Sequence, residues 1–157
     1  MKLSEALRLG EFALPPAKRT WFAFTVVTGR LCGACAVGRA VYAAGFRPAQ
    51  PALAFRLQES TAALTAPCLP EDTLAMTQFF DAQWPWTRRA HTGRPHFWLL
   101  NPVLHVISLQ YEHLDKSLSE IADYIEQLEA QYDPDPVTMD VTPNVAGDAT
   151  QLRGVVQ

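Results

Sequence analysis

The chain has 157 residues, of which 48% are hydrophobic and 18% are charged. That is the size of one ordinary domain with enough apolar material to bury a core, so the composition excludes a disordered chain and a collagen-like one. The net charge of −3 combines a basic segment, with 11 Lys/Arg and 6 Asp/Glu in residues 1–111, and an acidic one, with 2 and 10 in residues 112–157. The two segments carry about +5 and −8, and we expect them to attract each other within a chain or between subunits.

The first two predicted elements are a helix and a strand. Apolar residues recur at helical spacing from Leu3 to Leu14 with charged residues between them, and two prolines at 15 and 16 end the pattern. The segment from Trp21 to Val27 is aromatic and β-branched and is followed by Thr-Gly-Arg, a turn sequence. These patterns predict a short amphipathic helix and then a short strand or hairpin near residues 21–28.

Small residues dominate the next segment, from Cys32 to Ala44, and Gly45 follows as a natural helix C-cap. The pattern predicts a thin helix that its neighbours can approach closely. Residues 46–72 contain four prolines and are predicted to form a connector with one helix at 52–64. Met76, Phe79 and Phe80 indicate another short helix, which Trp84-Pro85-Trp86 closes.

The clearest pattern is a pair of amphipathic helices between residues 101 and 132. Asn101 with Pro102 forms an N-cap and N1 pair for the first helix, and Ser117 with Glu120 forms a capping box for the second. The few residues between the helices force them into an αα-hairpin. We predict that a partner binds at this acidic hairpin, through a set of apolar and aromatic residues: Tyr111, Leu118, Ile121, Ile125, Leu128 and Tyr132.

The fold class predicted from these elements is mainly α, a single small domain with a short strand or hairpin near residues 21–28 and a C-terminal αα-hairpin. We expect residues 1–132 to form the globular domain and residues 133–157 to form an extended, Pro-containing tail. The N-terminus lacks the apolar run of a secretory signal, and the uncharged stretch from Phe97 to Tyr111, of 15 residues, is too short and too polar to span a membrane. We therefore expect a cytoplasmic protein without a membrane partner.

The motif Cys32-Gly33-Ala34-Cys35 follows a predicted strand and begins a predicted helix. We favour the interpretation in which both cysteines are small core residues. The alternatives are a thiol-redox pair at a helix N-terminus, or a zinc site in which the two cysteines join His91 and His96. Three cysteines in all are typical of a reducing compartment, and no other cofactor is indicated.

Catalytic and nucleic-acid signatures are weak. His105 and His113 are eight positions apart, so they do not form an i, i+4 metal pair, and no paired carboxylates or Ser/His/Asp spacing stand out. Cations lie beside aromatic residues in two segments, as they do in single-strand binding sites, although tryptophans are more often core anchors. The residues of this nucleic-acid hypothesis are Lys18, Arg19, Trp21, Trp86, Arg88 and Arg89.

Four segments resemble a group of small bacterial and phage proteins whose function is unknown. They are Met1–Gly10 (MKLSEALRLG), Cys35–Gly38 (CAVG), Trp84–Trp86 (WPW) and Glu120–Glu126 (EIADYIE). The resemblance implies a common scaffold of N-terminal helix, small-residue helix and C-terminal hairpin. It includes a counterpart of Cys35 but none of Cys32, which implies that the Cys-x-x-Cys motif is not a shared active site.

These observations favour a non-enzymatic interaction or assembly protein that acts through its acidic C-terminal hairpin and its tail. The partner would be another protein or a second copy of the chain, so that a homo-oligomer is one expected form. The first alternative is a thiol-redox or zinc-binding module built on Cys32 and Cys35. The second is a nucleic-acid-associated regulator that uses the basic aromatic segments, although we expect no DNA or RNA partner.

Overall fold

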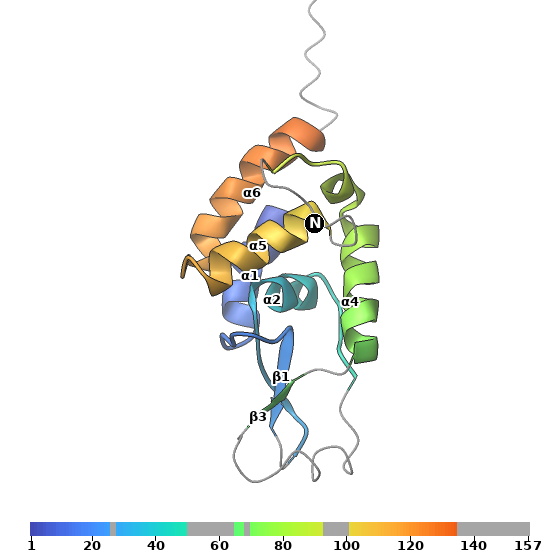
Figure 1. Cartoon of the computed structure of the whole chain (residues 1–157), viewed down its shortest axis with the longest axis vertical. Helices are drawn as coiled ribbons and strands as arrows, with labels where there is room; N and C mark the ends of the chain where they lie inside the picture. Colours follow the sequence, from blue (N-terminus) through green and yellow to red (C-terminus); the bar gives the residue numbers. More distant parts are fainter. Residues whose placement is uncertain (26–27, 50–64, 68–69, 93–100, 135–157) are drawn as a thin grey trace, which may run out of the picture.

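The computed structural model describes residues 1–25, 28–49, 65–67, 70–92 and 101–134 (Figure 1). Helices predominate in these segments, and a small antiparallel sheet lies at one end of the molecule, next to α1 and α2 (Figure 1). This arrangement confirms the mainly α, single-domain fold that the sequence predicts. The predicted helix at 52–64 and nearly all of the predicted tail at 133–157 lie outside the described residues.

The N-terminal helix α1, Leu3–Ala13, has the buried face that its periodicity predicts. Leu3, Ala6 and Leu7 are completely buried. A Cβ added to Gly10 would lie 2.9 Å from the backbone of Arg39, so glycine allows α1 to approach the next helix closely. Helix α1 packs along both α2 and α6, which makes it the central helix of the core.

The sheet consists of β1, Phe22–Thr25, β2, Leu31–Ala34, and β3, Thr65–Pro67, in the order β2-β1-β3. Strands β1 and β2 form the predicted hairpin, with Phe22 opposite Ala34, and Gly29 in the turn has a φ of 63°. Strand β3 pairs with the other edge of β1. The sequence did not predict β3, because it lies in the Pro-rich connector.

Helix α2, Ala36–Ala43, begins later than predicted. Residues 32–34 belong to β2 and Cys35 is the N-cap, so the prediction of a helix from Cys32 is wrong at its start. Pairing with β1 determines the conformation here, because local propensity gives way to tertiary hydrogen bonds. The C-terminus is as predicted: the Phe46 N–H donates to the Val41 carbonyl at 2.9 Å and the Gly45 N–H to the Tyr42 carbonyl at 3.1 Å, with φ of +110° at Gly45.

Helix α4, Pro70–Gln83, and the 3₁₀ helix η1, Pro85–Arg88, follow the connector. The helix predicted around Met76 and Phe80 is therefore confirmed, and it starts further upstream. Both of those side chains are buried, as are Trp84 and Trp86, each 2% exposed. Trp84, the N-cap of η1, and Trp86, within η1, are therefore core anchors, and their rings are not available to stack on nucleic-acid bases.

The C-terminal helices are α5, Pro102–Glu112, and α6, Leu118–Tyr132. Both predicted caps are present. The Asn101 side chain accepts hydrogen bonds from the first turn of α5 at 3.0 and 3.1 Å, and Ser117 and Glu120 form the capping box of α6. A tight turn joins the helices, but α6 packs more extensively along α1 than along α5.

A buried charged side chain holds each end of α1, and the one at its N-terminus comes from the acidic C-terminal segment. At the N-terminus of α1, the buried Glu129 side chain accepts hydrogen bonds from the Leu3 N–H at 2.6 Å and from the Ser4 N–H at 3.1 Å and hydroxyl at 2.5 Å. At its C-terminus, the buried Arg39 donates to the carbonyls of Gly10 at 3.0 Å and Glu11 at 2.5 Å. An anion at the first turn and a cation at the last complement the helix dipole of α1.

Candidate functional site

The apolar face of the C-terminal hairpin packs into the hydrophobic core of the chain. Leu118, Ile121, Ile125 and Leu128 are between 0% and 7% exposed, and Tyr111 is 6% exposed. Tyr132 is half-buried, and its hydroxyl oxygen accepts a hydrogen bond from the His91 N–H at 3.1 Å. The six side chains predicted as an interaction face are therefore engaged within the chain, and a partner can meet only the opposite face of α6.

That opposite face is acidic. Glu120, Asp123 and Glu126 are exposed on α6, and Arg8 of α1 reaches Asp123 at 2.8 Å and Glu126 at 2.6 Å. Hydrogen bonds to Glu126 and then Asp123 raise the pKa of Arg8 above its ordinary value. We call the three carboxylates Glu120, Asp123 and Glu126 the α6 acidic face. These ion pairs are exposed, so they contribute little to stability and leave the carboxylates accessible.

Helix α1 exposes two large apolar side chains beside this face. Phe12 is 88% exposed and Leu9 is 52% exposed. Because they are three positions apart on a helix, they are neighbours on one side of it. We call Leu9 and Phe12 the α1 stripe. Arg8, which precedes the stripe in sequence, points to the α6 carboxylates, so the stripe borders the α6 acidic face.

The two cysteines of the Cys-x-x-Cys motif have different surroundings, and neither is in a disulfide. Cys32 lies on β2, where its thiol donates to the Ala23 carbonyl at 3.3 Å and burial raises its pKa. Cys35 is the N-cap of α2, is 5% exposed and lines a pocket. Cys32 is therefore held by a hydrogen bond within the sheet, whereas Cys35, the more buried of the two, lies in the wall of a pocket.

The zinc hypothesis finds no assembled site in the part of the chain that is described. His91 is exposed after η1, and its ring lies 6.5 Å from the ring of Tyr132. His96 lies outside the described residues. Among the residues that are described, no three His, Cys, Asp or Glu side chains come together as a metal would require. A zinc site stays a prediction.

The six residues of the nucleic-acid hypothesis do not form one exposed surface. The Trp86 side chain is buried and cannot stack on a base. Arg88 forms an ion pair with Asp81, and Lys18 forms one with Asp115 that raises the pKa of Lys18 and lowers that of Asp115. Arg89 is exposed, and Arg19 and Trp21 line the pocket that contains Cys35.

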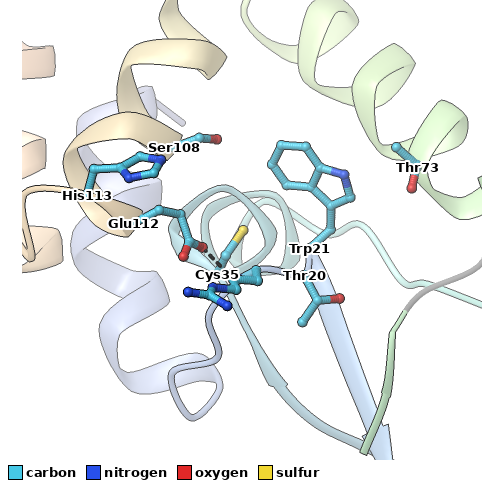
Figure 2. Close-up of a pocket in the computed structure, with 8 residues that line it drawn as sticks. Thr20, Trp21, Cys35, Thr73, Ser108, Glu112 and His113 are labelled. Atoms are coloured by element: carbon cyan, nitrogen blue, oxygen red, sulfur yellow. Dashed lines mark hydrogen bonds between the residues drawn. The ribbon is translucent and has the colours of Figure 1, made fainter.

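That pocket has a volume of about 490 Å³ and lies between the start of β1, the N-terminus of α2, and helices α4 and α5 (Figure 2). Sequence reasoning missed it as a site, because its lining residues come from elements far apart in the chain and no spacing connects them. The residues that line it are Arg19, Thr20, Trp21, Cys35, Thr73, Ser108, Glu112 and His113.

No family model, no curated protein and no solved structure matches this chain. The resemblance to small bacterial and phage proteins therefore stays a prediction. No helix within the described segments is both long enough and apolar enough to cross a membrane. The function must be inferred from the surfaces themselves.

Proposed function

We propose that the chain is a non-enzymatic protein-interaction or assembly protein, and that a protein partner binds across the α1 stripe and the α6 acidic face. The observation that carries the proposal is Phe12, a phenylalanine 88% exposed on a well-formed helix with a second exposed apolar residue beside it. Exposed apolar groups that lie together and are bordered by polar residues mark interaction sites.

The energetics favour a role in binding. Burying one phenylalanine side chain contributes roughly 2–3 kcal/mol, and aromatic residues are enriched among the few positions that dominate an interface. Leu9 adds a neighbouring apolar contact. The α6 carboxylates would form the polar rim that typically surrounds such a centre.

The charges of the rim define the partner. Asp123 and Glu126 retain 66% and 61% of their side-chain exposure despite their contact with Arg8. A partner of matching chemistry carries apolar side chains flanked by Lys or Arg, whereas nucleic-acid phosphates would be repelled. The partner is a protein in the cytoplasm, either a second copy of this chain or another chain. The C-terminal tail, residues 133–157, was also predicted to contact the partner, but nearly all of it lies outside the described residues.

The test compares Phe12→Ala with Leu74→Ala, a matched exposed residue (59% exposed) on α4. Native mass spectrometry of the purified chain first reports whether a second copy is bound. Calorimetry with the partner then measures affinity, and we expect Phe12→Ala to weaken it by about tenfold or more and Leu74→Ala to leave it unchanged. Higher salt should also weaken binding. Equal affinities for the wild type and Phe12→Ala would contradict the proposal.

A further inference from the structure

The pocket between Trp21 and the end of α5 shares no residue with the α1 stripe or the α6 acidic face, so its occupant is independent of the proposed interaction. Its volume of about 490 Å³ lies in the range of small-molecule sites. Figure 2 shows the Trp21 ring on one side of the space and Glu112 and His113 on the other. A molecule in the pocket would therefore contact both an aromatic ring and ionisable side chains.

Two residues of opposite charge, Arg19 and Glu112, line this pocket. They are in contact through the Arg19 backbone N–H, which donates to the Glu112 carboxylate at 3.0 Å. Among the described residues, however, the Arg19 guanidinium has no ion-pair or hydrogen-bond partner, and the second carboxylate oxygen of Glu112 has none either. The neighbouring cation, Lys18, is instead paired with Asp115. The pocket therefore keeps one cationic group and one anionic group available to a bound molecule.

The backbone of Arg19 adopts a conformation that is unusual for an arginine. Its φ is 61°, and among the described residues only Asp115 shares a positive φ without being a glycine. This left-handed region is unfavourable for a residue with a Cβ, and residues held there often lie in functional sites. Glycine or asparagine would adopt this backbone with less strain. The presence of arginine at this position therefore favours a role for its side chain.

Glu112 lies where a negative charge is disfavoured. It is the last residue of α5, at the negative end of the helix dipole, and the last turn of this helix contains no basic residue. A cation beside the carboxylate would offset this repulsion. An ammonium group of a bound molecule, placed against the second carboxylate oxygen, would supply that cation together with a charge-assisted hydrogen bond.

Trp21 provides the apolar part of the site. It is half-buried, because it packs against the hydrophobic core, and it also lines the pocket. An indole ring can bury a large area against an aliphatic or aromatic group. The pocket thus combines a cation, an anion and an apolar wall.

We propose that this pocket binds a free α-amino acid with an apolar side chain. The Arg19 guanidinium holds the carboxylate of the ligand, because its fork of N–H groups matches a carboxylate in two parallel hydrogen bonds. Glu112 accepts from the ammonium group, and Trp21 packs against the side chain. A free amino acid carries both charges on one carbon atom, whereas a peptide carries them at opposite ends. Neighbouring groups of opposite charge therefore favour the free amino acid.

The experiment follows the indole N–H signal of Trp21 by NMR while L-phenylalanine is titrated into the full-length chain, with Trp21→Phe used to identify that signal. Two analogues are titrated in the same way: phenethylamine lacks the carboxylate, and phenylpropionate lacks the ammonium group. We expect phenylalanine to bind about tenfold more tightly than either analogue, or more, because each analogue loses one charge-assisted contact. This comparison uses the wild-type chain, so it does not depend on the folding of a variant.

Two variants that remove a charge assign the contacts. Arg19→Gln should abolish the preference for phenylalanine over phenethylamine and keep the preference over phenylpropionate. Glu112→Gln should do the reverse, while it retains an oxygen acceptor for the Arg19 N–H. Arg89→Gln, at an exposed arginine outside the pocket, is the matched control and should leave all three affinities unchanged. An unmoved Trp21 signal, equal affinities of the wild type for the three compounds, or preferences that survive both variants would overturn the proposal.

Discussion

Glu129 should be one of the most important single side chains for stability, although it lies on a helix rich in exposed carboxylates. It is 2% exposed and accepts three hydrogen bonds from the start of α1, two from backbone N–H groups and one from the Ser4 hydroxyl. The first N–H groups of a helix have no partner within the helix. Glu129 supplies that partner from more than 120 residues away in sequence.

Glu129→Ala leaves those three donors buried without an acceptor. Each unsatisfied group costs about 1–3 kcal/mol, and the N-terminal position of the carboxylate adds a favourable dipole interaction that is also lost. We expect the free energy of unfolding to fall by about 4 kcal/mol. For a domain of this size that corresponds to a decrease in Tm of roughly 10 °C. Urea and thermal unfolding followed by circular dichroism measure both quantities.

Two further variants sharpen the test. Glu129→Gln keeps one carbonyl acceptor but places an NH₂ group against donors, so its loss should lie between those of the wild type and Glu129→Ala. Glu126→Ala removes an exposed partner of Arg8 and should cost less than about 1 kcal/mol. If Glu129→Ala destabilised the protein no more than Glu126→Ala, the argument that α1 is held by a tertiary cap would be refuted.

Two other predictions concern packing and pH. A Cβ at Gly38 would lie 2.0 Å from the carbonyl oxygen of Trp21, so Gly38→Ala should lower the free energy of unfolding, measured by urea titration, by about 3 kcal/mol or more. Gly45 lies in open space but has a φ of +110°, so Gly45→Ala should lower the same free energy by only roughly 1–2 kcal/mol, through backbone strain. The backbone N–H and the hydroxyl of Ser117 donate hydrogen bonds to Glu120 and lower the pKa of this carboxyl group. The ionised carboxylate therefore stabilises the fold at pH values above its ordinary pKa, and this contribution is lost as the pH falls through the lowered pKa. The stability difference between wild type and Glu120→Gln should therefore shrink from roughly pH 5 to pH 3, and a constant difference over that range would contradict the capping role.

Local signals predicted the helices well. The capping residues Asn101 and Ser117 specify where α5 and α6 begin, because their side chains satisfy N–H groups only a few positions away. The periodicity from Leu3 to Gly10 likewise identifies the buried face of α1. In each case the sequence pattern and the stabilising contact lie in the same short segment.

Features that depend on distant contacts were not predictable. Small residues around Cys32 favour a helix, but pairing with β1 makes this segment a strand. The periodicity of α6 shows that Ile121 and Ile125 face something apolar, yet it does not reveal that α1 of the same chain covers them. The hydrogen bond from the Ser4 hydroxyl to Glu129 and the pocket around Cys35 join elements that no spacing in the sequence relates.

The most direct test of the proposed interaction replaces Phe12 with the photo-reactive residue p-benzoylphenylalanine in living cells. The same replacement at Leu74, on α4 at the opposite side of α2 from α1, provides the matched control (Figure 1). The account predicts one discrete cross-linked species from position 12, either a second copy or another protein, and none from position 74. No cross-link from position 12, or the same products from both positions, would contradict the claim that the α1 stripe is the binding surface.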